Sequence, residues 1–468
     1  MLNDIQSSIH IYPYKNTWLA IDTSTSTIFE LNTKMKDYIL DGKENTDEIY
    51  ELNWVLNQYK KEGYFNLLIP ENESPEYMRE IVVSVQNTLE CPMNCDYCFS
   101  KKIVCETKTM DKQTALDIVE YIFNNYDENA DRVEIYFTSG GEPLNNFEII
   151  KLINEKARLL AKKNNKEFNI GFTTNAVLLN ENMIQYLEHE NIGFMISVDG
   201  DRDEHNSTRK FYNGNGTYEY VIKAVERLNK SDNPYLNKTQ AMSVLTPYHY
   251  DYVKRLKDLV NMGFKKVNLK LVKNVDESSK KLNKLQITNI IDGYDNLLEF
   301  LKESVLDNEW KFIDAVLDQN NTLGQIMINL LLKKKILYRC GAGKNKISIL
   351  PNGDIYPCDY FSINLESKIG DIYTGINKEK QEQWYARSCT SMSCCSDCWA
   401  KYLCGGSCYY TRYLNNGIPD EVECRINQYL IEKIAGIIFE IKQKNMIIYK
   451  HLVNRAKGVK KLTHGEFV

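Results

Sequence analysis

The sequence lacks several features that mark common functional classes. It has only 6 histidines in 468 residues, and none lies near its densest group of cysteines. Its 58 basic and 63 acidic side chains nearly balance, without a basic stripe interleaved with aromatic residues, so a nucleic-acid partner is not expected. No internal repeat occurs at solenoid spacing, which argues against a repeat architecture.

Targeting and membrane signals are also missing. The first residues, MLNDIQSSIHIYPYK, lack the charged start, the apolar run and the cleavage site of a secretory signal. No stretch approaches the roughly 18 uninterrupted apolar residues of a membrane-spanning helix. We therefore expect a cytoplasmic protein that does not contact membranes.

Cysteine is abundant but unevenly placed. Of 13 cysteines, Cys91, Cys95, Cys98 and Cys105 come early, none follows until Cys340, and the others fall between there and Cys424. Because cytosolic reductants keep thiols free, such a pattern favours metal or redox chemistry over disulfides. The sequence thus predicts two separate metal-binding regions.

Between these regions, short β-rich runs alternate with segments of helical apolar spacing. Six such units predict an α/β fold, a partial (β/α)6 TIM-like barrel with a parallel sheet covered by helices. The expected strands are 81–86, 133–138, 168–174, 193–198, 239–245 and 266–272. Polar or cysteine-bearing loops follow the first four strands, and the carboxyl ends of parallel strands are where such folds place their chemistry. We therefore expect these four loops to lie together at the end of the barrel formed by the carboxyl ends of its strands.

The segments flanking the barrel differ from it. Three strand-like runs precede two helical patterns, near 33–40 and 46–62, which suggests a small winged-helix-like unit or else a simple structural cap; the acidic stretch 70–77 suits a linker. A loop-rich, cysteine-rich segment later ends in a helix near 425–442. The expected domains are 1–75, a barrel over 76–305, a helical bridge over 306–339, a cysteine-rich domain over 340–445 and a C-terminal tail over 446–468.

The first cysteine group has the form Cys-x3-Cys-x2-Cys, as Cys91, Cys95 and Cys98, with Tyr97 before the last thiol. This spacing resembles the signature of the radical S-adenosylmethionine (SAM) superfamily. There, three thiolates hold a [4Fe–4S] cluster and leave one iron for SAM to chelate. The alternative is a zinc knuckle with a distant fourth ligand, for which Cys105 is the nearest candidate.

The resemblance extends to the other strand ends. Gly140-Gly141-Glu142-Pro143 is similar to the loop that binds the methionine amino group of SAM, and the third and fourth strand ends also match. Ser197 and Arg209 correspond to residues that hold the ribose and carboxylate, although Arg209 also suits a solvated surface charge. The SAM-binding residues implied are Tyr97, Gly140, Gly141, Glu142, Pro143, Thr174, Asn175, Ser197, Asp199 and Arg209.

The late cysteines resemble the SPASM domain, a C-terminal module with two auxiliary iron–sulfur clusters. By that resemblance the outer cluster is ligated by Cys395, Cys398, Cys404 and Cys424, and the inner one by Cys340, Cys358 and Cys408. Three [4Fe–4S] clusters and SAM are therefore the implied cofactors. The cysteines Cys105, Cys389 and Cys394 stay unassigned.

The sequence departs from the related sulfatase maturases at one place. Those enzymes carry a further cysteine six positions after the first SPASM cysteine, where this chain has Lys346, so the inner cluster is expected to lack a fourth protein thiolate. The acid that serves them as proton acceptor corresponds to Asp359, a candidate general base that also suits an ordinary loop acid.

Together these features resemble maturases of ribosomally made peptides that form thioether crosslinks. The resemblance implies a 5′-deoxyadenosyl radical that abstracts hydrogen from a peptide residue, a leader peptide bound by residues 1–75 as a recognition element, and an electron donor such as flavodoxin or ferredoxin. Formylglycine formation on a sulfatase, and carbon–carbon crosslinking or epimerisation of a peptide, are competing enzyme functions. A zinc-dependent binding or scaffold protein is the alternative outside enzymes.

Overall fold

The computed structural model describes residues 8–41, 79–126, 130–230, 235–273, 282–385 and 387–459, together with the single positions 6, 58 and 61. The expected linker 70–77 lies outside these residues, as does the expected helix 46–62 apart from positions 58 and 61. The first expected helix of the N-terminal unit is present as α2, Thr33–Asp41.

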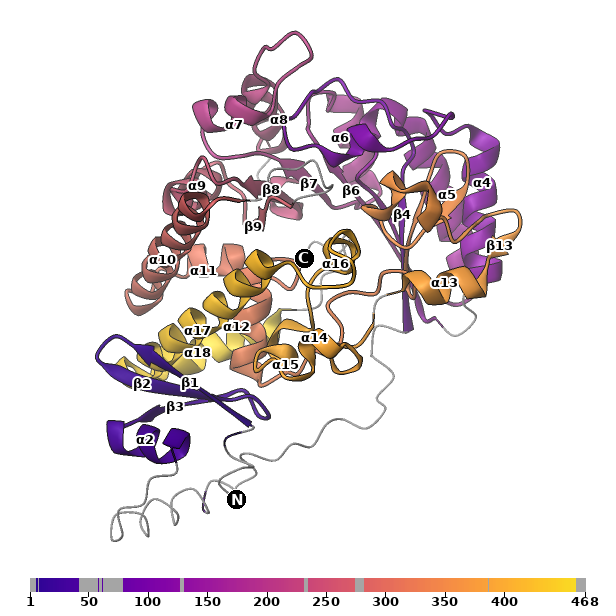
Figure 1. The fold of residues 1–468 in the computed structure, drawn as a ribbon. Coiled ribbons are helices and arrows are strands. Elements are labelled where there is room, and N and C mark those ends of the chain that lie inside the picture. The colour runs from indigo at the N-terminus through magenta and orange to yellow at the C-terminus, as the bar shows by residue number, and fades with distance from the viewer. Residues whose placement is uncertain are drawn as a thin grey trace.

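Six parallel strands form the centre of the molecule, as the sequence predicted. They are β4 (Glu80–Val85), β5 (Arg132–Phe137), β6 (Glu167–Thr174), β7 (Phe194–Ser197), β8 (Thr239–Leu245) and β9 (Lys266–Leu271). Each strand pairs in parallel with the next in sequence order. Such pairing gives the open arc of a partial barrel in Figure 1.

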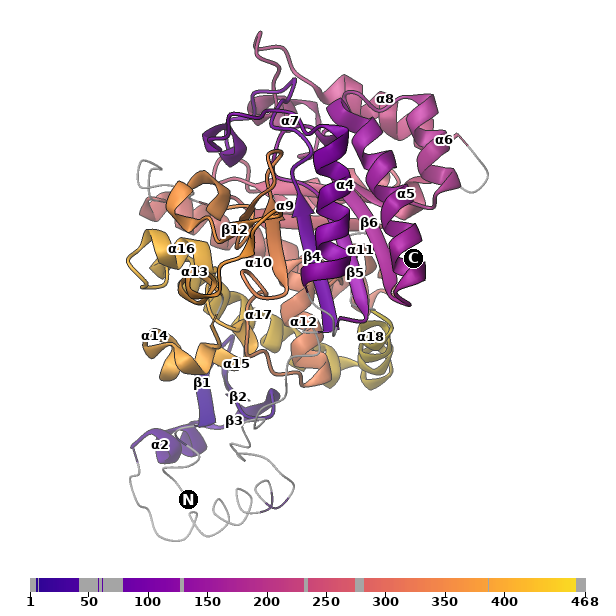
Figure 2. The same ribbon diagram turned by 90° about the vertical axis from the view of Figure 1, so that its right-hand side faces the viewer.

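Helices between the strands cover the outside of this arc. They are α4 (Lys112–Tyr121), α5 (Phe147–Lys163), α6 (Glu181–His189), α7 (Arg202–Thr208), α8 (Tyr218–Leu228) and α9 (Tyr252–Asn261). Several begin at a side chain that accepts a backbone N–H of the first turn, such as Asp111, Asn180 and Asp251. Figure 2 shows α4 and α5 standing against β4, β5 and β6.

The sheet continues past β4 into the cysteine-rich region. Strand β10 (Lys346–Ile349) pairs in parallel with β4, and β11 (Asp354–Tyr356), β12 (Gly370–Asp371) and β13 (Gly375–Ile376) follow as antiparallel strands. The short helices α13 (Lys378–Trp384), α14 (Ser393–Ser396), α15 (Lys401–Cys404) and α16 (Tyr409–Leu414) complete this region. The segment with the late cysteines is thus built directly onto the first barrel strand.

Long helices pack beside the open side of the barrel. They are α10 (Lys284–Leu306), α11 (Trp310–Val316), α12 (Thr322–Leu332), α17 (Glu421–Lys444) and α18 (Met446–Gly458). Helix α17 packs against α10, α12 and α18. The segment expected as a C-terminal tail therefore begins with a helix, which buries Ile448 and Leu452. None of the described helices combines the length and apolar character needed to cross a membrane.

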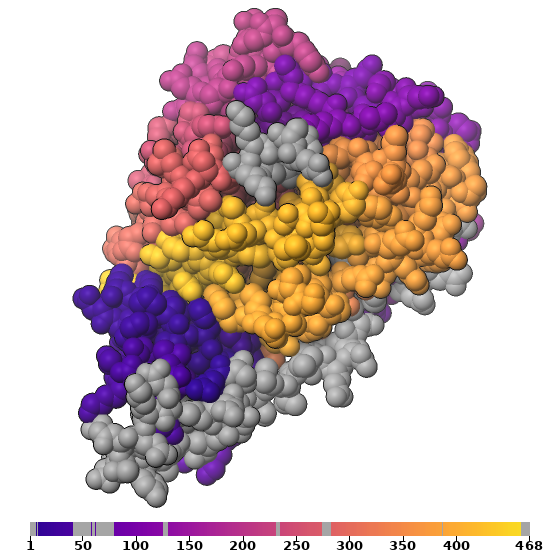
Figure 3. Space-filling model, in the orientation of Figure 1, coloured from indigo at the N-terminus to yellow at the C-terminus, as the bar shows by residue number. Residues whose placement is uncertain are grey.

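The N-terminal unit is a three-stranded antiparallel sheet, β1 (Ile9–Tyr14), β2 (Thr17–Asp22) and β3 (Thr27–Leu31), as predicted. It docks on α17, where the Tyr12 hydroxyl donates to the Glu432 carbonyl at 3.1 Å. His10 stacks on Trp399 with ring centroids 3.6 Å apart. Figure 3 shows this indigo unit lying against the yellow C-terminal helices. Its side chains thus contact both α17 and the cysteine-rich region.

Candidate functional site

The loop after β4 holds the first three cysteines. Its backbone is fixed by the end of α7 and the residues just after it, since the amides of Asn94 and Asp96 donate to the carbonyls of Lys210 (2.6 Å) and Thr208 (3.0 Å). Burial raises the pKa of Cys91 to about 12 and also raises that of Cys95. Buried thiols of this kind ionise when positive metal centres compensate the charge, so the donor set fits an iron–sulfur cluster.

A cubane cluster and a single metal ion require different distances between the sulfur atoms of these thiols. Among the described residues, no three His, Cys, Asp or Glu side chains lie close enough together to hold one metal ion. A tetrahedral zinc would need sulfurs about 3.8 Å apart, given Zn–S bonds of about 2.3 Å. A cubane instead spreads its thiolates over separate irons, each with its own protein ligand.

Glu142 connects the loops after β5 and β6 to the cysteine loop after β4. Its backbone amide donates to the Glu90 carbonyl at 2.8 Å. Its carboxylate accepts from the Thr174 hydroxyl at 2.6 Å and from the backbone amide of Asn175 at 2.8 Å. Burial outweighs these bonds and raises the pKa of Glu142 to about 7. The structure thus brings Glu142, Thr174 and Asn175 together, and a bound ammonium group would restore the charge of this carboxyl.

Gly141 makes the close approach of these loops possible. A Cβ at Gly141 would lie 1.9 Å from the carbonyl oxygen of Glu90, which belongs to the rigid backbone next to Cys91. We predict that Gly141→Ala displaces the cysteine loop and lowers the free energy of unfolding by roughly 1–3 kcal/mol or more. If three cubanes are present as expected, the iron content of the reconstituted protein should fall by about a third. Iron analysis checks this. Gly458→Ala, with open space around its Cβ, should retain the iron, and an unchanged iron content in Gly141→Ala would contradict the prediction.

A buried ion pair organises the fourth strand end. Asp199 Oδ2 accepts from Arg209 Nε at 2.7 Å and from the Tyr97 hydroxyl at 2.5 Å, while the guanidinium lies 5.4 Å from the Tyr97 ring centre. Burial alone would raise the pKa of Asp199, but Arg209 and Arg255 outweigh it and lower the pKa to about 2. Arg209 is therefore not a solvated surface charge, since it is 6% exposed. Ser197 ends β7 with a half-buried side chain.

Sequence reasoning passed over His205, which supports this ion pair. The Asp199 backbone amide donates to His205 Nδ1 at 3.3 Å, and His205 Nε2 lies 3.0 Å from the Thr217 hydroxyl. Burial and the charge of Arg209 lower the pKa of this histidine to about 3, so it is neutral. Its signal was its place six residues after Asp199, in the helix α7 that follows this strand end.

The thiols of Cys340, Cys358 and Cys408 lie within electrostatic reach of one another. Burial raises the pKa of Cys358, and the negative charges of Asp359, Cys408 and Cys340 add to this effect. These thiols come from three segments: before β10, after β11 and at the start of α16. Such a group fits the inner cluster that the sequence implied.

Aromatic rings connect this group with the cysteine loop of the barrel. The ring of Tyr360, two residues after Cys358, lies 4.5 Å from that of Phe99, which directly follows Cys98. Tyr360 also stacks on Tyr410 at 5.6 Å. The two predicted cluster sites thus share one wall of packed rings.

The structure also groups the thiols expected around the outer cluster, Cys395, Cys398, Cys404 and Cys424. Burial raises the pKa of Cys424 to about 12, with further contributions from Cys404, Glu423 and Cys398. Helix α17 directs amide donors at two of the sulfurs, Gln428 at Cys398 (3.5 Å) and Asn427 at Cys404 (3.8 Å). Amide donors to sulfur favour a charged thiolate or a cluster.

The unassigned cysteines have different surroundings. Cys389 is fully buried near Cys404 and Cys398, whose charges raise its pKa after the larger effect of burial. The sulfur of Cys394 lies 4.0 Å from that of Cys395. Cys105 packs instead in a separate apolar cluster with Leu350 and Tyr356. Neither the sequence nor the structure assigns a ligand role to these three.

Asp359 and Lys346 lie beside the inner thiols. Burial alone would lower the pKa of Lys346, but the negative charges of Asp359, Cys358 and Cys340 outweigh it and raise the pKa. Asp359 is 8% exposed, and its Oδ1 atom has no hydrogen-bond partner. A buried carboxylate oxygen without a partner suits a group that takes a proton from a bound substrate.

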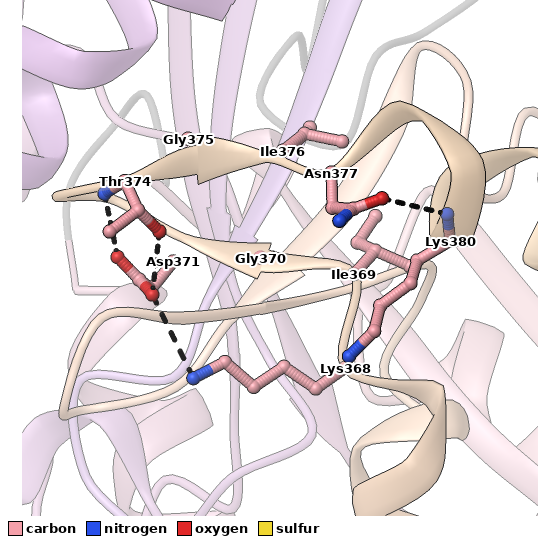
Figure 4. A pocket seen from close by; sticks show the side chains of 9 residues that line it. All are labelled: Lys368, Ile369, Gly370, Asp371, Thr374, Gly375, Ile376, Asn377 and Lys380. Atoms are coloured by element: carbon pink, nitrogen blue, oxygen red, sulfur yellow. Dashed lines mark hydrogen bonds and ion pairs between the residues drawn. The ribbon is translucent and has the colours of Figure 1, made fainter.

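A hollow of about 370 Å³ lies at the β12–β13 hairpin, lined by none of the predicted site residues. Its walls are a turn in which the Asp371 carboxylate accepts from the Thr374 backbone amide at 2.8 Å and from the Thr374 hydroxyl at 2.9 Å (Figure 4). These bonds shape the turn itself, so the hollow is explained without a ligand.

Known proteins resemble the chain over 44% to 85% of its length. It is 30% identical over 221 residues to the uncharacterized protein MJ0907 of Methanocaldococcus jannaschii, covering 44% of this chain and 71% of that protein. It is 23% identical to the radical SAM cyclopropyl synthase TigE of Paramaledivibacter caminithermalis, covering 85% of each chain. Identity is also 23% to a cysteine-type anaerobic sulfatase-maturating enzyme of Clostridium novyi, covering 73% of this chain and 92% of that enzyme.

The fold matches a solved structure described as native anSMEcpe with bound AdoMet and Cp18Cys peptide. The match has a TM-score of 0.61 at 20% identity and covers 81% of this chain and 100% of the other. The family model described as the Radical SAM superfamily matches residues 88–260, the span that holds the three-cysteine loop, Glu142 and the Asp199–Arg209 ion pair. The chain therefore belongs to the radical SAM superfamily, whose enzymes bind SAM beside a [4Fe–4S] cluster.

Proposed function

We propose that the protein is a maturase of a ribosomally made precursor peptide and joins a cysteine sulfur of that peptide to a carbon atom as a thioether. The observation that carries this proposal is the inner group of three thiols, Cys340, Cys358 and Cys408, with Lys346 where sulfatase maturases have a cysteine. Similarity to TigE over most of both chains, and the shared fold with a peptide-bound enzyme, support a peptide substrate.

The chain provides sites for the cofactors that this reaction needs. Cys91, Cys95 and Cys98 would hold the SAM-binding cluster, and Glu142 would accept the amino group of SAM. When bound, the cofactors supply a 5′-deoxyadenosyl radical for hydrogen abstraction and an iron that favours a substrate thiolate. The ion pair of Asp199 with Arg209 fixes the loop that carries Tyr97, and therefore the position of the nearby thiols.

Asp359 is proposed to take up a proton during thioether formation. Forming a C–S bond from C–H and S–H removes two protons and two electrons, the equivalent of two hydrogen atoms, from the peptide. One hydrogen atom leaves from carbon, the thiol proton passes to a base, and the remaining electron passes to the iron–sulfur centres. Asp359 is the buried carboxylate nearest in sequence to Cys358, and Lys346 keeps a positive charge beside it.

The N-terminal sheet is proposed to bind the leader of the precursor. Among the described residues, the outer sides of β1 and β3 pair with no further strand, and an extended peptide can add a strand to such an edge. The docking of Tyr12 and His10 on α17 and Trp399 holds this sheet against the cysteine-rich region. A leader bound there would tether the rest of the peptide near the barrel.

Mass spectrometry of the product tests the proposed reaction. The reconstituted protein, SAM and dithionite are incubated with a short cysteine-rich peptide encoded next to this protein. We expect a product that is two hydrogen atoms lighter and has lost one thiol to iodoacetamide labelling. Replacing the acceptor cysteine of the peptide by alanine should abolish the product. If the alanine peptide still gave a product two hydrogen atoms lighter, the proposal would be overturned.

Formylglycine formation is the second candidate, favoured by Asp359 and by the similarity to the Clostridium novyi enzyme. The lysine at position 346 argues against it. A formylglycine product would react with hydrazines, whereas a thioether would not. Carbon–carbon bond formation, which the name of TigE brings into consideration, would leave every peptide thiol open to labelling.

A further inference from the structure

Three lysines gather where the partial barrel opens. Lys270 lies on β9, Lys273 follows the end of that strand, and Lys346 begins β10 beyond the opposite end of the six-stranded arc. Figure 1 shows β9 and β4 at these opposite ends. The side chains of Lys270 and Lys273 are exposed, and that of Lys346 is half-buried. Desolvation by the surrounding protein still lowers the pKa of Lys270, and repulsion from Lys346 and Lys273 adds to this effect. The three ammonium groups therefore share one electrostatic environment.

The side chains that face these lysines do not neutralise them by contact. In the described part of the chain, no carboxylate lies within 4.0 Å of the ammonium group of Lys270, Lys273 or Lys346. Of the neighbouring carboxylates, Glu423 accepts from the Thr411 hydroxyl at 2.9 Å and Asp318 accepts from the backbone amide of Asn320 at 2.7 Å. Asp318 Oδ2 and Asp359 Oδ1 have no hydrogen-bond partner among the described residues. Together with Arg339 near Lys273, four cationic side chains therefore face the three carboxylates of Glu423, Asp318 and Asp359.

An unpartnered amide lies on the same face of β9. Asn268 is 2% exposed, and neither its Nδ2 nor its Oδ1 atom has a hydrogen-bond partner. Because side chains alternate along a strand, Asn268 and Lys270 point to one side, opposite the buried Val267 and Leu269. A buried amide without a partner is uncommon and points to a ligand that completes its hydrogen bonds.

We infer that Lys270, Lys273 and Asn268 bind a carboxylate of the peptide substrate, either an acidic side chain or a chain terminus, at the open seam of the barrel. The two ammonium groups would balance its charge and the Asn268 amide would donate a hydrogen bond to it. This inference rests on the proposed function only in taking the substrate to be a peptide.

The competing explanation is that the lysines balance the charge of the inner cluster. That explanation suits Lys346, which lies near Cys358 and Cys340. It also suits Lys273, whose pKa is raised by the negative charge of Cys408. The charged groups that act most strongly on Lys270 are instead Lys346, Lys273, Asp318 and Asp359. Lys270 is therefore the residue whose substitution separates the two explanations.

Binding of blocked peptides to the cluster-reconstituted protein, without turnover, tests the inference. The probes for isothermal titration are Ac-Gly-Gly-Glu-Gly-Gly-NH2, the same peptide with Gln in place of Glu, and acetylated pentaglycine with a free carboxyl end. We expect one of the two carboxylate peptides to bind about tenfold more tightly than the Gln peptide. Which one does so identifies the source of the carboxylate.

Variants complete the test. Lys270→Gln should remove the preference, whereas Lys254→Gln should keep it, because Lys254 pairs with Asp201 and Asp258 on the outer surface. Equal binding of all three peptides would overturn the inference. So would a preserved preference in Lys270→Gln, and a changed cluster reduction potential in that variant would then support charge balance. Peptide preference without any crosslinked product would instead reject the proposed function.

Discussion

Replacing Cys91, Cys95 and Cys98 together by alanine should reduce reductive cleavage of SAM to background, by a factor of at least about 10³, because the cofactors carry the hard chemical step. The same variant should keep about two thirds of the iron, since it loses one of three expected cubanes. The loop itself is held by backbone bonds of Asn94 and Asp96 to the end of α7 and the residues just after it, which do not need the thiols.

Two measurements check this prediction: 5′-deoxyadenosine released with dithionite as reductant, and iron with acid-labile sulfide per chain. Cys105→Ala is the matched control, because this thiol is also buried but packs among apolar side chains. It should leave the iron content unchanged. Cleavage of SAM by the triple variant, or stoichiometric zinc in the unmodified protein, would contradict the cluster assignment.

The barrel was predictable because its strands are short runs rich in β-branched, aromatic and other apolar residues, which differ from the helical spacing of the segments between them. The run 133–138 was predicted, and β5 spans Arg132–Phe137; the run 239–245 was predicted, and β8 has those bounds. The pairing of β10 with β4 was not predictable, since a four-residue strand carries no local mark of its partner. Helix α18 was overlooked although Ile448, Leu452 and Ala456 follow helical spacing.

The candidate site, too, was predictable only in part. Motif spacing indicated which thiols belong to the barrel loop, and the structure adds that Glu142 joins three loops through its backbone and its carboxylate. The lysines at the seam could not be singled out because exposed lysines are common on protein surfaces, and Lys270 and Lys273 are exposed here as well. The alternation of Asn268 and Lys270 with Val267 and Leu269 on an expected barrel strand was the available signal. The ligand roles of the late cysteines stay predictions.

Lys346→Cys should separate radical formation from crosslinking. Cysteine occupies the corresponding position in the sulfatase maturases that the sequence resembles, and Lys346 lies within electrostatic reach of Cys340 and Cys358. A thiolate here would complete the inner cluster with a fourth protein ligand and leave no iron for a substrate thiol. We expect crosslinked product to fall about 10²-fold while release of 5′-deoxyadenosine continues, because binding of the substrate sulfur is lost and the radical step is not.

Lys346→Ser is the matched variant, since it removes the same ammonium group without offering a thiolate. Loss of the positive charge beside Asp359 slows both variants, so the difference between them isolates ligation by the new cysteine. Product mass, product yield and 5′-deoxyadenosine are measured in parallel for both. If Lys346→Cys forms crosslinked peptide as fast as Lys346→Ser, the inner iron does not bind the substrate sulfur. If Lys346→Cys instead yields a product that reacts with hydrazines, this one position decides between thioether and formylglycine chemistry.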